Sequence, residues 1–234
     1  MSAPGAPRAV GPSRDLVPVL REAVLRLLDR ADDDGVVPIV QAGHPVLRAV
    51  AHRYDGWLAD DELARLLDVL RATMRAAPGV GLAAPQVGLP VAVAVLADPG
   101  SPDPDVALVR ERPVLAPRVL VNPRYEALDE ERVGFYEGCL SVVGYQAVVA
   151  RPRRVRLVGQ DETGRALDEV VEGWPARIVQ HETDHLHGTL YLDRAELRSL
   201  STSDAQGARW AVPARPVEAA RLLGFPLAGL DTDA

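Results

Sequence analysis

The chain has 234 residues, of which 47% are hydrophobic, and this is enough for one domain of ordinary size with some extensions. Its formal net charge of -7 argues against a broad surface for nucleic acid or anionic membranes. The single cysteine, Cys139, cannot form an internal disulfide, and no apolar run approaches the ~18 residues of a membrane helix or supplies a secretory signal. We therefore expect a cytoplasmic protein with no direct contact to nucleic acid or membrane.

The N-terminal part of the chain predicts two helices. Residues 1–14 are rich in Pro, Gly, Ala and Ser and form a loose lead-in, and apolar residues at helical spacing predict a helix over 15–33. Asp60 and Asp61 are both candidates for the cap of a second helix, which the Pro-Gly pair at 78–79 would end. Its apolar stripe consists of Leu63, Leu66, Leu67, Leu70 and Met74.

Short apolar runs bounded by Pro, Gly or Asp predict strands in the middle of the chain. The first three are 91–96, 106–109 and 119–121. Two more, 155–158 and 167–171, flank a DETG segment with the pattern of a β-hairpin turn.

The last third of the chain returns to helical patterns. Because proline suits the first helical turn, a helix is expected to begin near Trp174-Pro175 and to run to Gly188. A short helix is expected over 216–223. Strands between two helical ends place the chain in the α+β class.

The pattern HETDH at 181–185 lies on the first of these helices. Positions four apart share one helical face, so His181 and His185 can point at one metal ion. Glu182 neighbours the pair and can act as a general base on a metal-activated water. The alternative for this short pattern alone is a solvated helix face whose histidines bind nothing.

A catalytic metal site needs a third protein ligand and one open position. The metzincin pattern requires a histidine where Tyr191 stands, so that class of zinc protease is excluded. Glu196 is a candidate for a thermolysin-like site, although it follows Gly188 closely for a ligand on a second helix. Cys139 is the remaining candidate, and because it lies far from the histidines in sequence, only the fold can bring it near them.

Three ordered motifs make the chain resemble the peptide deformylases. They are GVGLAAPQ at 79–86, EGCLS at 137–141 and QHETDHLHG at 180–188, and HPVLR at 44–48 also resembles the opening segment of that family. The resemblance covers residues 38–194 and implies mainly antiparallel sheets packed around a central helix that carries the HExxH motif. Residues 1–37 and 195–234 are then an N-terminal and a C-terminal extension.

The resemblance implies that Cys139, His181 and His185 hold one divalent metal ion. It further implies that Glu182 takes a proton from water and delivers it to the leaving amine. A thiolate with two imidazoles suits both Zn(II) and Fe(II). In the family Fe(II) is the native metal and is lost on contact with oxygen, and Zn(II) or Ni(II) are substitutes.

The resemblance also implies groups that bind the substrate. The side-chain amide of Gln86 and the backbone N–H of Leu140 would donate to the formyl oxygen as it becomes negative. Val80 and Gly81 would pair with the peptide like an added strand, and Gly138 would border it.

Some positions depart from the family pattern. Val143, Gln146 and Ala150 stand where relatives commonly carry Pro, Arg and Pro, which bears on peptide affinity and leaves the metal chemistry untouched. Glu137 and Arg151 are expected to form a buried ion pair behind the metal loop, and exchanging the two charges is the test of that pairing. Arg177 either borders the substrate pocket or pairs with an acid.

The implied reaction is removal of the N-formyl group from the starting methionine of newly synthesised polypeptides. The substrates are then formyl-methionyl nascent peptides. The protein is expected to be a monomer that associates transiently with the ribosome. The segment 195–234 carries acids about as often as Arg, so docking by a basic tail is not expected. Two alternatives remain: a zinc endopeptidase that does not need Cys139, and a metal-binding scaffold with lapsed catalysis.

Overall fold

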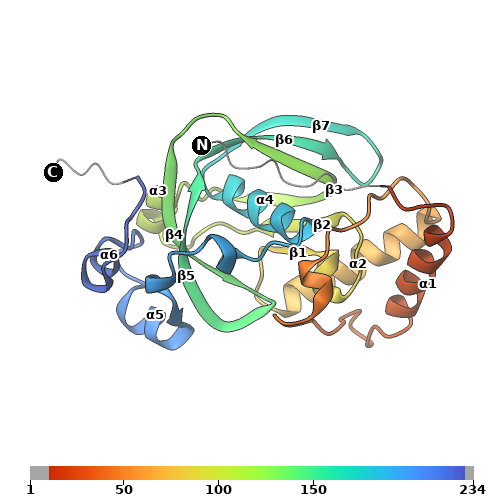
Figure 1. Cartoon of the computed structure of the whole chain (residues 1–234), viewed down its shortest axis with the longest axis horizontal. Coiled ribbons are helices and arrows are strands. Elements are labelled where there is room, and N and C mark those ends of the chain that lie inside the picture. Colours follow the sequence, from red (N-terminus) through yellow and green to blue (C-terminus); the bar gives the residue numbers. More distant parts are fainter. Residues whose placement is uncertain (1–10, 230–234) are drawn as a thin grey trace.

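The computed structural model describes residues 11–229 and contains a five-stranded antiparallel sheet (Figure 1). Residues 1–10 of the expected lead-in lie outside the described part. The strand order is β1-β2-β3-β6-β7, and every neighbouring pair is antiparallel. The strands are β1 (Gly81–Ala83), β2 (Val93–Asp98), β3 (Leu115–Ala127), β6 (Arg154–Gln160) and β7 (Ala166–Glu172).

Helices cover both faces of this sheet at strand β2. Val93 and Val95 of β2 pack in the core shared with α1 (Leu16–Leu28) and α2 (Asp60–Ala76). Ala94 and Leu96 point to the other face, where they pack with α4 (Gly173–Leu186). Because successive side chains of a strand point to opposite faces, a strand covered on both sides reads as a continuous apolar run. This explains why β2 was recognisable in the sequence.

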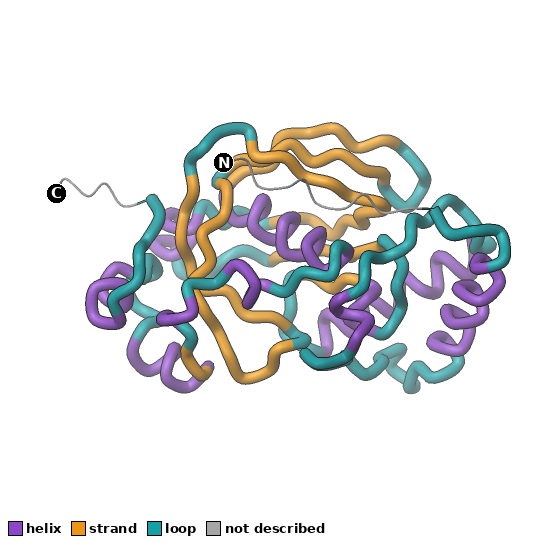
Figure 2. Tube along the Cα trace, viewed as in Figure 1, coloured by secondary structure: helices purple, strands orange, loops and turns teal. Residues whose placement is uncertain are grey.

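A second sheet stands beside α4 (Figure 2). Its strands are β4 (Arg132–Cys139), β5 (Val142–Pro152) and β8 (Ser201–Thr202), in the order β4-β5-β8. Helix α4 contacts every strand of the five-stranded sheet and also β5. The expected α+β architecture, with antiparallel sheets around a central helix, is therefore confirmed.

The two ends of the described chain pack against the rest of the molecule. Helix α1 packs on α2, while α5 (Ser203–Arg209) and α6 (Val217–Leu223) lie at the other end of the molecule beside the β4–β5 hairpin (Figure 1). The division at residues 37 and 194 stays a prediction. Short 3-10 turns complete the fold at Pro45–Arg48, Ala84–Val87, Tyr191–Arg194 and Leu197–Ser199. Among residues 11–229, no helix has the length and apolarity required to cross a bilayer.

The strand expected over 106–109 is wrong, because this segment belongs to helix α3 (Pro104–Arg110). The carboxylate of Asp103 accepts from the backbone N–H groups of Asp105 and Val106, at 2.9 and 3.3 Å. An N-cap aspartate followed by proline starts a helix, and these two residues outweigh the β propensity of the valines that follow.

The cap expected for α2 is also wrong. The N-cap is Ala59, whose backbone N–H donates to the Glu62 carboxylate at 3.0 Å, and Asp60 and Asp61 lie in the first helical turn. The helices expected at 174–188 and 216–223 are confirmed as α4 and α6, and the DETG segment joins β6 to β7 as a hairpin. Strands β4 and β5 were not predicted.

Candidate active site

Helix α4 brings together the histidines of the HETDH pattern. The ring centres of His181 and His185 are 5.0 Å apart. The thiol sulfur of Cys139 lies 3.2 Å from Nε2 of His185. One ligand atom from each of these three residues lies within 4.8 Å of the other two. The structure therefore places the sequence-distant cysteine beside the helix face that carries both imidazoles.

Cys139 reaches this position because it is the last residue of β4. The β4–β5 ladder runs in regular register from Arg132 to Gly138 and then shifts between Gly138 and Cys139. The loop after the cysteine is held by the carbonyl of Ser141, which accepts from the backbone N–H of Ala42 at 2.7 Å. The Ser141 backbone N–H itself donates to the cysteine sulfur at 3.4 Å.

A buried carboxylate fixes the orientation of His181. Nδ1 of His181 lies 3.0 Å from Oε2 of Glu137, and since a carboxylate only accepts, Nδ1 carries the hydrogen. The ring of Tyr191 stacks on the imidazole, with 6.2 Å between ring centres. Nε2 of His181 is left as the free ligand atom. An imidazole oriented by a carboxylate in this way is the common arrangement at metal sites.

Glu137 belongs to a network of buried charges. Arg151 donates to it at 2.6 and 2.9 Å, and Arg177 donates to it at 2.6 Å. Burial alone would raise the pKa of the Glu137 carboxyl, but the arginine charges and the bond from His181 outweigh burial and hold the pKa well below 4.5. The expected pairing of Glu137 with Arg151 is confirmed. Arg177 meets both expectations: it pairs with the acid Glu137, and it lines the groove described below.

The network continues to Asp184, which no sequence pattern marks as part of the site. Asp184 accepts from Arg151 at 2.8 Å, from Arg194 at 2.9 and 3.1 Å, and from the hydroxyl of Tyr125 at 2.9 Å. It lies between the two site histidines in the chain, but its partners come from distant strands and a 3-10 turn. Only their positions in the fold reveal its role in holding α4.

Glu182 is buried beside the histidines, with 4% of its surface exposed. Its Oε2 has no hydrogen-bond partner among the described residues, and burial raises the pKa of the carboxyl to about 7. The backbone of Gly81 approaches it so closely that a Cβ there would lie 2.3 Å from Oε1 of Glu182. A side chain at residue 81 would therefore displace the carboxylate.

Gln86 has its amide oriented by the backbone. Its Oε1 accepts from the N–H of Ala83 at 2.8 Å, so Nε2 points the other way, 3.6 Å from the sulfur of Cys139. Leu140 directly follows the cysteine, and its carbonyl accepts from the side chain of Gln41 at 3.1 Å. The side-chain amide of Gln86 thus faces the cysteine sulfur.

A groove of about 950 Å³ runs over this site. Trp174, Arg177 and Ile178 of α4 contribute to its wall, and His185 lies fully buried beneath it. The other residues predicted for the site all line the groove: Val80, Gly81, Gln86, Gly138, Cys139, Leu140, His181 and Glu182.

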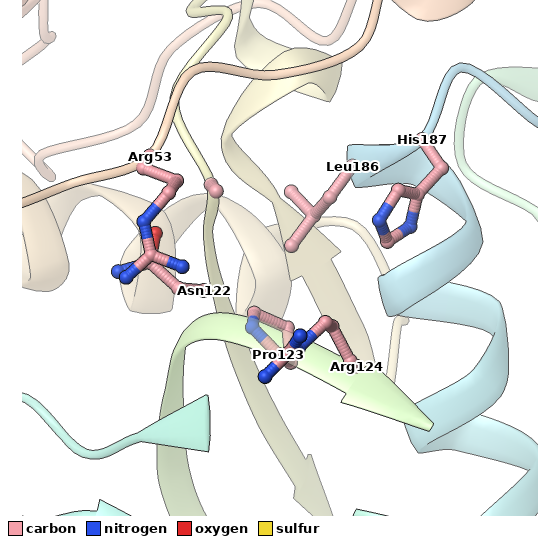
Figure 3. Close-up of a pocket in the computed structure, with 7 residues that line it drawn as sticks. Arg53, Asn122, Pro123, Arg124, Leu186 and His187 are labelled. Atoms are coloured by element: carbon pink, nitrogen blue, oxygen red, sulfur yellow. The ribbon is translucent and has the colours of Figure 1, made fainter. Parts of the chain in front are cut away.

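A second hollow of about 200 Å³ lies at the C-terminal end of α4 (Figure 3). Arg53, Arg124 and His187 contribute to its lining, and it contains none of the residues predicted for the site. The Nδ1 atom of His187 is 2.9 Å from the carbonyl oxygen of Thr183, so this histidine turns away from the other two. The larger groove is therefore the candidate active site.

The donor set of the groove fits a divalent transition metal. It consists of one thiol and two imidazoles, with one side open to the groove. Burial lowers the pKa of His185 well below 6.5, which favours the neutral imidazole that a metal ligand requires.

The known proteins that this chain resembles in sequence are peptide deformylases. A family model described as polypeptide deformylase matches residues 36–200. Peptide deformylase 3 of Streptomyces avermitilis is 58% identical over 215 residues, covering 90% of this chain and 96% of that protein. Peptide deformylase 1 of Streptomyces coelicolor is 56% identical over 220 residues, covering 94% of this chain and 99% of that protein.

A solved structure is also similar. It is a class I type b peptide deformylase from Acinetobacter baumannii with Met-Ala-Ser bound, and it superposes with a TM-score of 0.61 at 35% identity. The match covers 68% of this chain and 98% of that chain.

Proposed function

The chain belongs to the peptide deformylase family, and we propose how its own residues remove the N-formyl group from the N-terminal methionine of newly synthesised polypeptides, releasing formate. The family is metal-dependent. The observation that carries the proposal for the site is the approach of Cys139, His181 and His185 to within 4.8 Å of one another beneath an open groove. These three residues are the proposed metal ligands.

A divalent metal held there would lower the pKa of a water molecule and polarise the formyl oxygen. Glu182 takes the proton of the attacking water and passes it to the leaving amine. Its burial supports this role, because a carboxyl with a pKa near 7 both accepts and releases a proton at neutral pH.

Gln86 and Leu140 bind the formyl oxygen as it becomes negative. The amide of Gln86 is already oriented, with Oε1 held by Ala83 and Nε2 directed to the space beside the sulfur. A donor that needs no reorganisation stabilises the transition state most effectively. The backbone N–H of Leu140 is the second proposed donor.

The peptide lies along β1. This strand is at the edge of the five-stranded sheet, and Val80 and Gly81 line the groove beside it. An edge strand offers unpaired backbone groups to an extended peptide, and such pairing is independent of side chains. Gly138 borders the groove and faces Gln146 across the β4–β5 ladder. Backbone pairing suits an enzyme whose substrates share only their first residue.

The proposal includes Fe(II) as the native metal, with Zn(II) or Ni(II) as substitutes that the same donor set accepts. It further includes a monomer that works in the cytoplasm, where formylated chains are made, and that associates transiently with the ribosome. The sequence-level departures at Val143 and Gln146 would act on peptide affinity.

The test is formate release from formyl-Met-Ala-Ser by protein purified without oxygen and loaded with Fe(II). We expect rapid release, and we expect Glu182→Gln to lower the rate by a factor of about 10² to 10⁴ while it still binds one metal ion. Metal content is measured on the same samples. Absence of release by metal-loaded protein would contradict the proposal, and so would an active Glu182→Gln variant.

A further inference from the structure

A short segment of the chain, residues 36–42, joins two parts of the candidate site that are distant in sequence. The backbone N–H of Val40 donates to the carbonyl of Gln86 at 2.9 Å. Two residues later, the N–H of Ala42 donates to the carbonyl of Ser141 at 2.7 Å, in the loop that follows the cysteine. The segment therefore fixes the turn that carries Gln86 and this loop relative to each other.

Between these two bonds, the side chain of Gln41 reaches the same loop, residues 139–143, which we call the cysteine loop. Its Nε2 donates to the carbonyl of Leu140 at 3.1 Å, and its Oε1 accepts from the N–H of Val143 at 3.4 Å. The two partners lie 99 and 102 positions further along the chain. Gln41 is exposed and lines the substrate groove. One side-chain amide thus holds two residues of the cysteine loop.

Leu140 lies at the turn of the cysteine loop, where the regular β4–β5 ladder has ended. Its side chain packs against Gly79, where an added Cβ would lie 2.8 Å from Cδ1 of Leu140. Its carbonyl is held by Gln41. Because each residue has only two soft backbone dihedrals, a residue whose side chain and carbonyl are both held has little freedom to turn its N–H. Gln41 therefore contributes to the direction of the Leu140 N–H.

We propose that Gln41 is a positioning residue, which keeps the backbone N–H of Leu140 directed at the formyl oxygen of the substrate. The inference rests on the proposed function, in which that N–H and the amide of Gln86 bind the oxygen as it becomes negative. Donors that are already in place need no reorganisation during the reaction. Gln41 does not touch the reacting atoms and acts only through the cysteine loop.

The loss of this contact is expected in kcat. Because the oxygen becomes negative only on the way to the transition state, a misdirected donor lowers kcat and leaves KM nearly unchanged. The net worth of one hydrogen bond in a protein corresponds to about 2- to 12-fold in rate. We therefore expect Gln41→Met, which keeps the length of the side chain and removes both contacts, to lower kcat by about this factor.

Two further variants sharpen the comparison. Gln41→Glu keeps an acceptor for the N–H of Val143 but loses the donor to the carbonyl of Leu140, so it should be at least as slow as Gln41→Met. The matched control is Gln160→Met. The side chain of Gln160 donates to the carbonyl of Gly164 at 3.3 Å, in a hairpin turn outside the groove. Its variant removes the same kind of bond and should keep the kcat of wild type.

The proteins are compared on formyl-Met-Ala-Ser, loaded with Fe(II) without oxygen, well below their Tm and with metal content measured on each. A lower kcat in both Gln41 variants, with KM and metal content unchanged, supports the proposal. An unchanged kcat in Gln41→Met overturns it, and so does a change confined to KM. A loss of activity that matches a loss of bound metal also overturns it, because Gln41 then supports the ligand set.

Hydrogen exchange followed by mass spectrometry separates this inference from the proposed function, because it requires no turnover. A peptide that covers residues 139–145 should exchange faster in Gln41→Met than in wild type and in Gln160→Met, since the N–H of Val143 has lost its acceptor. Faster exchange supports the hold of Gln41 on the cysteine loop even if no formate is released, in which case the proposed function alone fails. Equal exchange in Gln41→Met and wild type overturns the inference whatever the activity.

Discussion

Arg151 offers the sharpest test of what holds helix α4 in place. Its guanidinium is 2% exposed and joins two carboxylates, Glu137 behind His181 and Asp184 on α4. Replacing it by Met removes the charge, keeps much of the volume and leaves both carboxylates buried. Removing one partner of a buried ion pair costs about 3 to 5 kcal/mol.

The lower end of that range applies here, because each carboxylate keeps another donor. Glu137 retains Arg177 at 2.6 Å, and Asp184 retains Arg194 at 2.9 Å. About 3 kcal/mol corresponds to a fall in Tm of roughly 6 to 12 °C for a chain of this size. The assay is thermal unfolding followed by circular dichroism, with urea unfolding as a second measure.

A matched control is Arg156→Met. Arg156 makes a similar two-pronged contact with Asp168, at 2.7 and 2.6 Å, but both side chains are about half exposed. Because water screens such a pair, we expect its loss to leave Tm nearly unchanged. If Arg151→Met and Arg156→Met lower Tm equally, burial does not determine how much these ion pairs stabilise the fold, and the prediction is refuted.

The same network changes the expectation for a charge exchange. The double variant Glu137→Arg/Arg151→Glu would put a carboxylate against Asp184 and a guanidinium against Arg177. We therefore expect no rescue of either single reversal, although the pair itself is present. Full rescue of stability would show that Glu137 and Arg151 act as an isolated pair.

Three further predictions concern the site itself. Gly81→Ala should displace the Glu182 carboxylate and lower kcat with metal content unchanged, because the new Cβ would lie 2.3 Å from Oε1 of Glu182. The control Gly207→Ala, whose Cβ would have no atom within 4 Å, should keep full activity. Equal kcat values in the two variants would disprove the contact. Glu137→Gln should weaken metal affinity by about 10- to 100-fold, because His181 loses the carboxylate that orients it. The affinity is measured by competition with a chelator. An unchanged affinity would show that Glu137 does not orient His181 for metal binding. Chelation should lower the Tm of wild type but not of Cys139→Ala, because only wild type then loses a bound ligand that stabilises the fold; a Tm shift of equal size in both would argue that Cys139 is not a ligand.

Features coded by neighbouring residues could be predicted from the sequence. The apolar stripe of α2 and the continuous apolar run of β2 reflect helical spacing and burial on both faces. The histidine pair of α4 follows from four-residue spacing alone. The valines of α3 favour a strand by propensity, but the capping Asp103 and the proline after it, both local signals, start a helix instead.

The β4–β5 hairpin could not be predicted in the same way, because its buried positions hold charges as well as apolar groups. Glu137 and Arg151 interrupt the alternation that identifies a strand, and their partners on α4 lie far along the chain. A buried charge is tolerable only where its counter-charge is already in place. The residues that orient His181 thus become interpretable only once the fold has paired them, whereas the proposed ligands follow from the HExxH spacing and from the family resemblance around Cys139. If these residues do hold a metal ion, the buried charge network behind His181 is what keeps its imidazole in position.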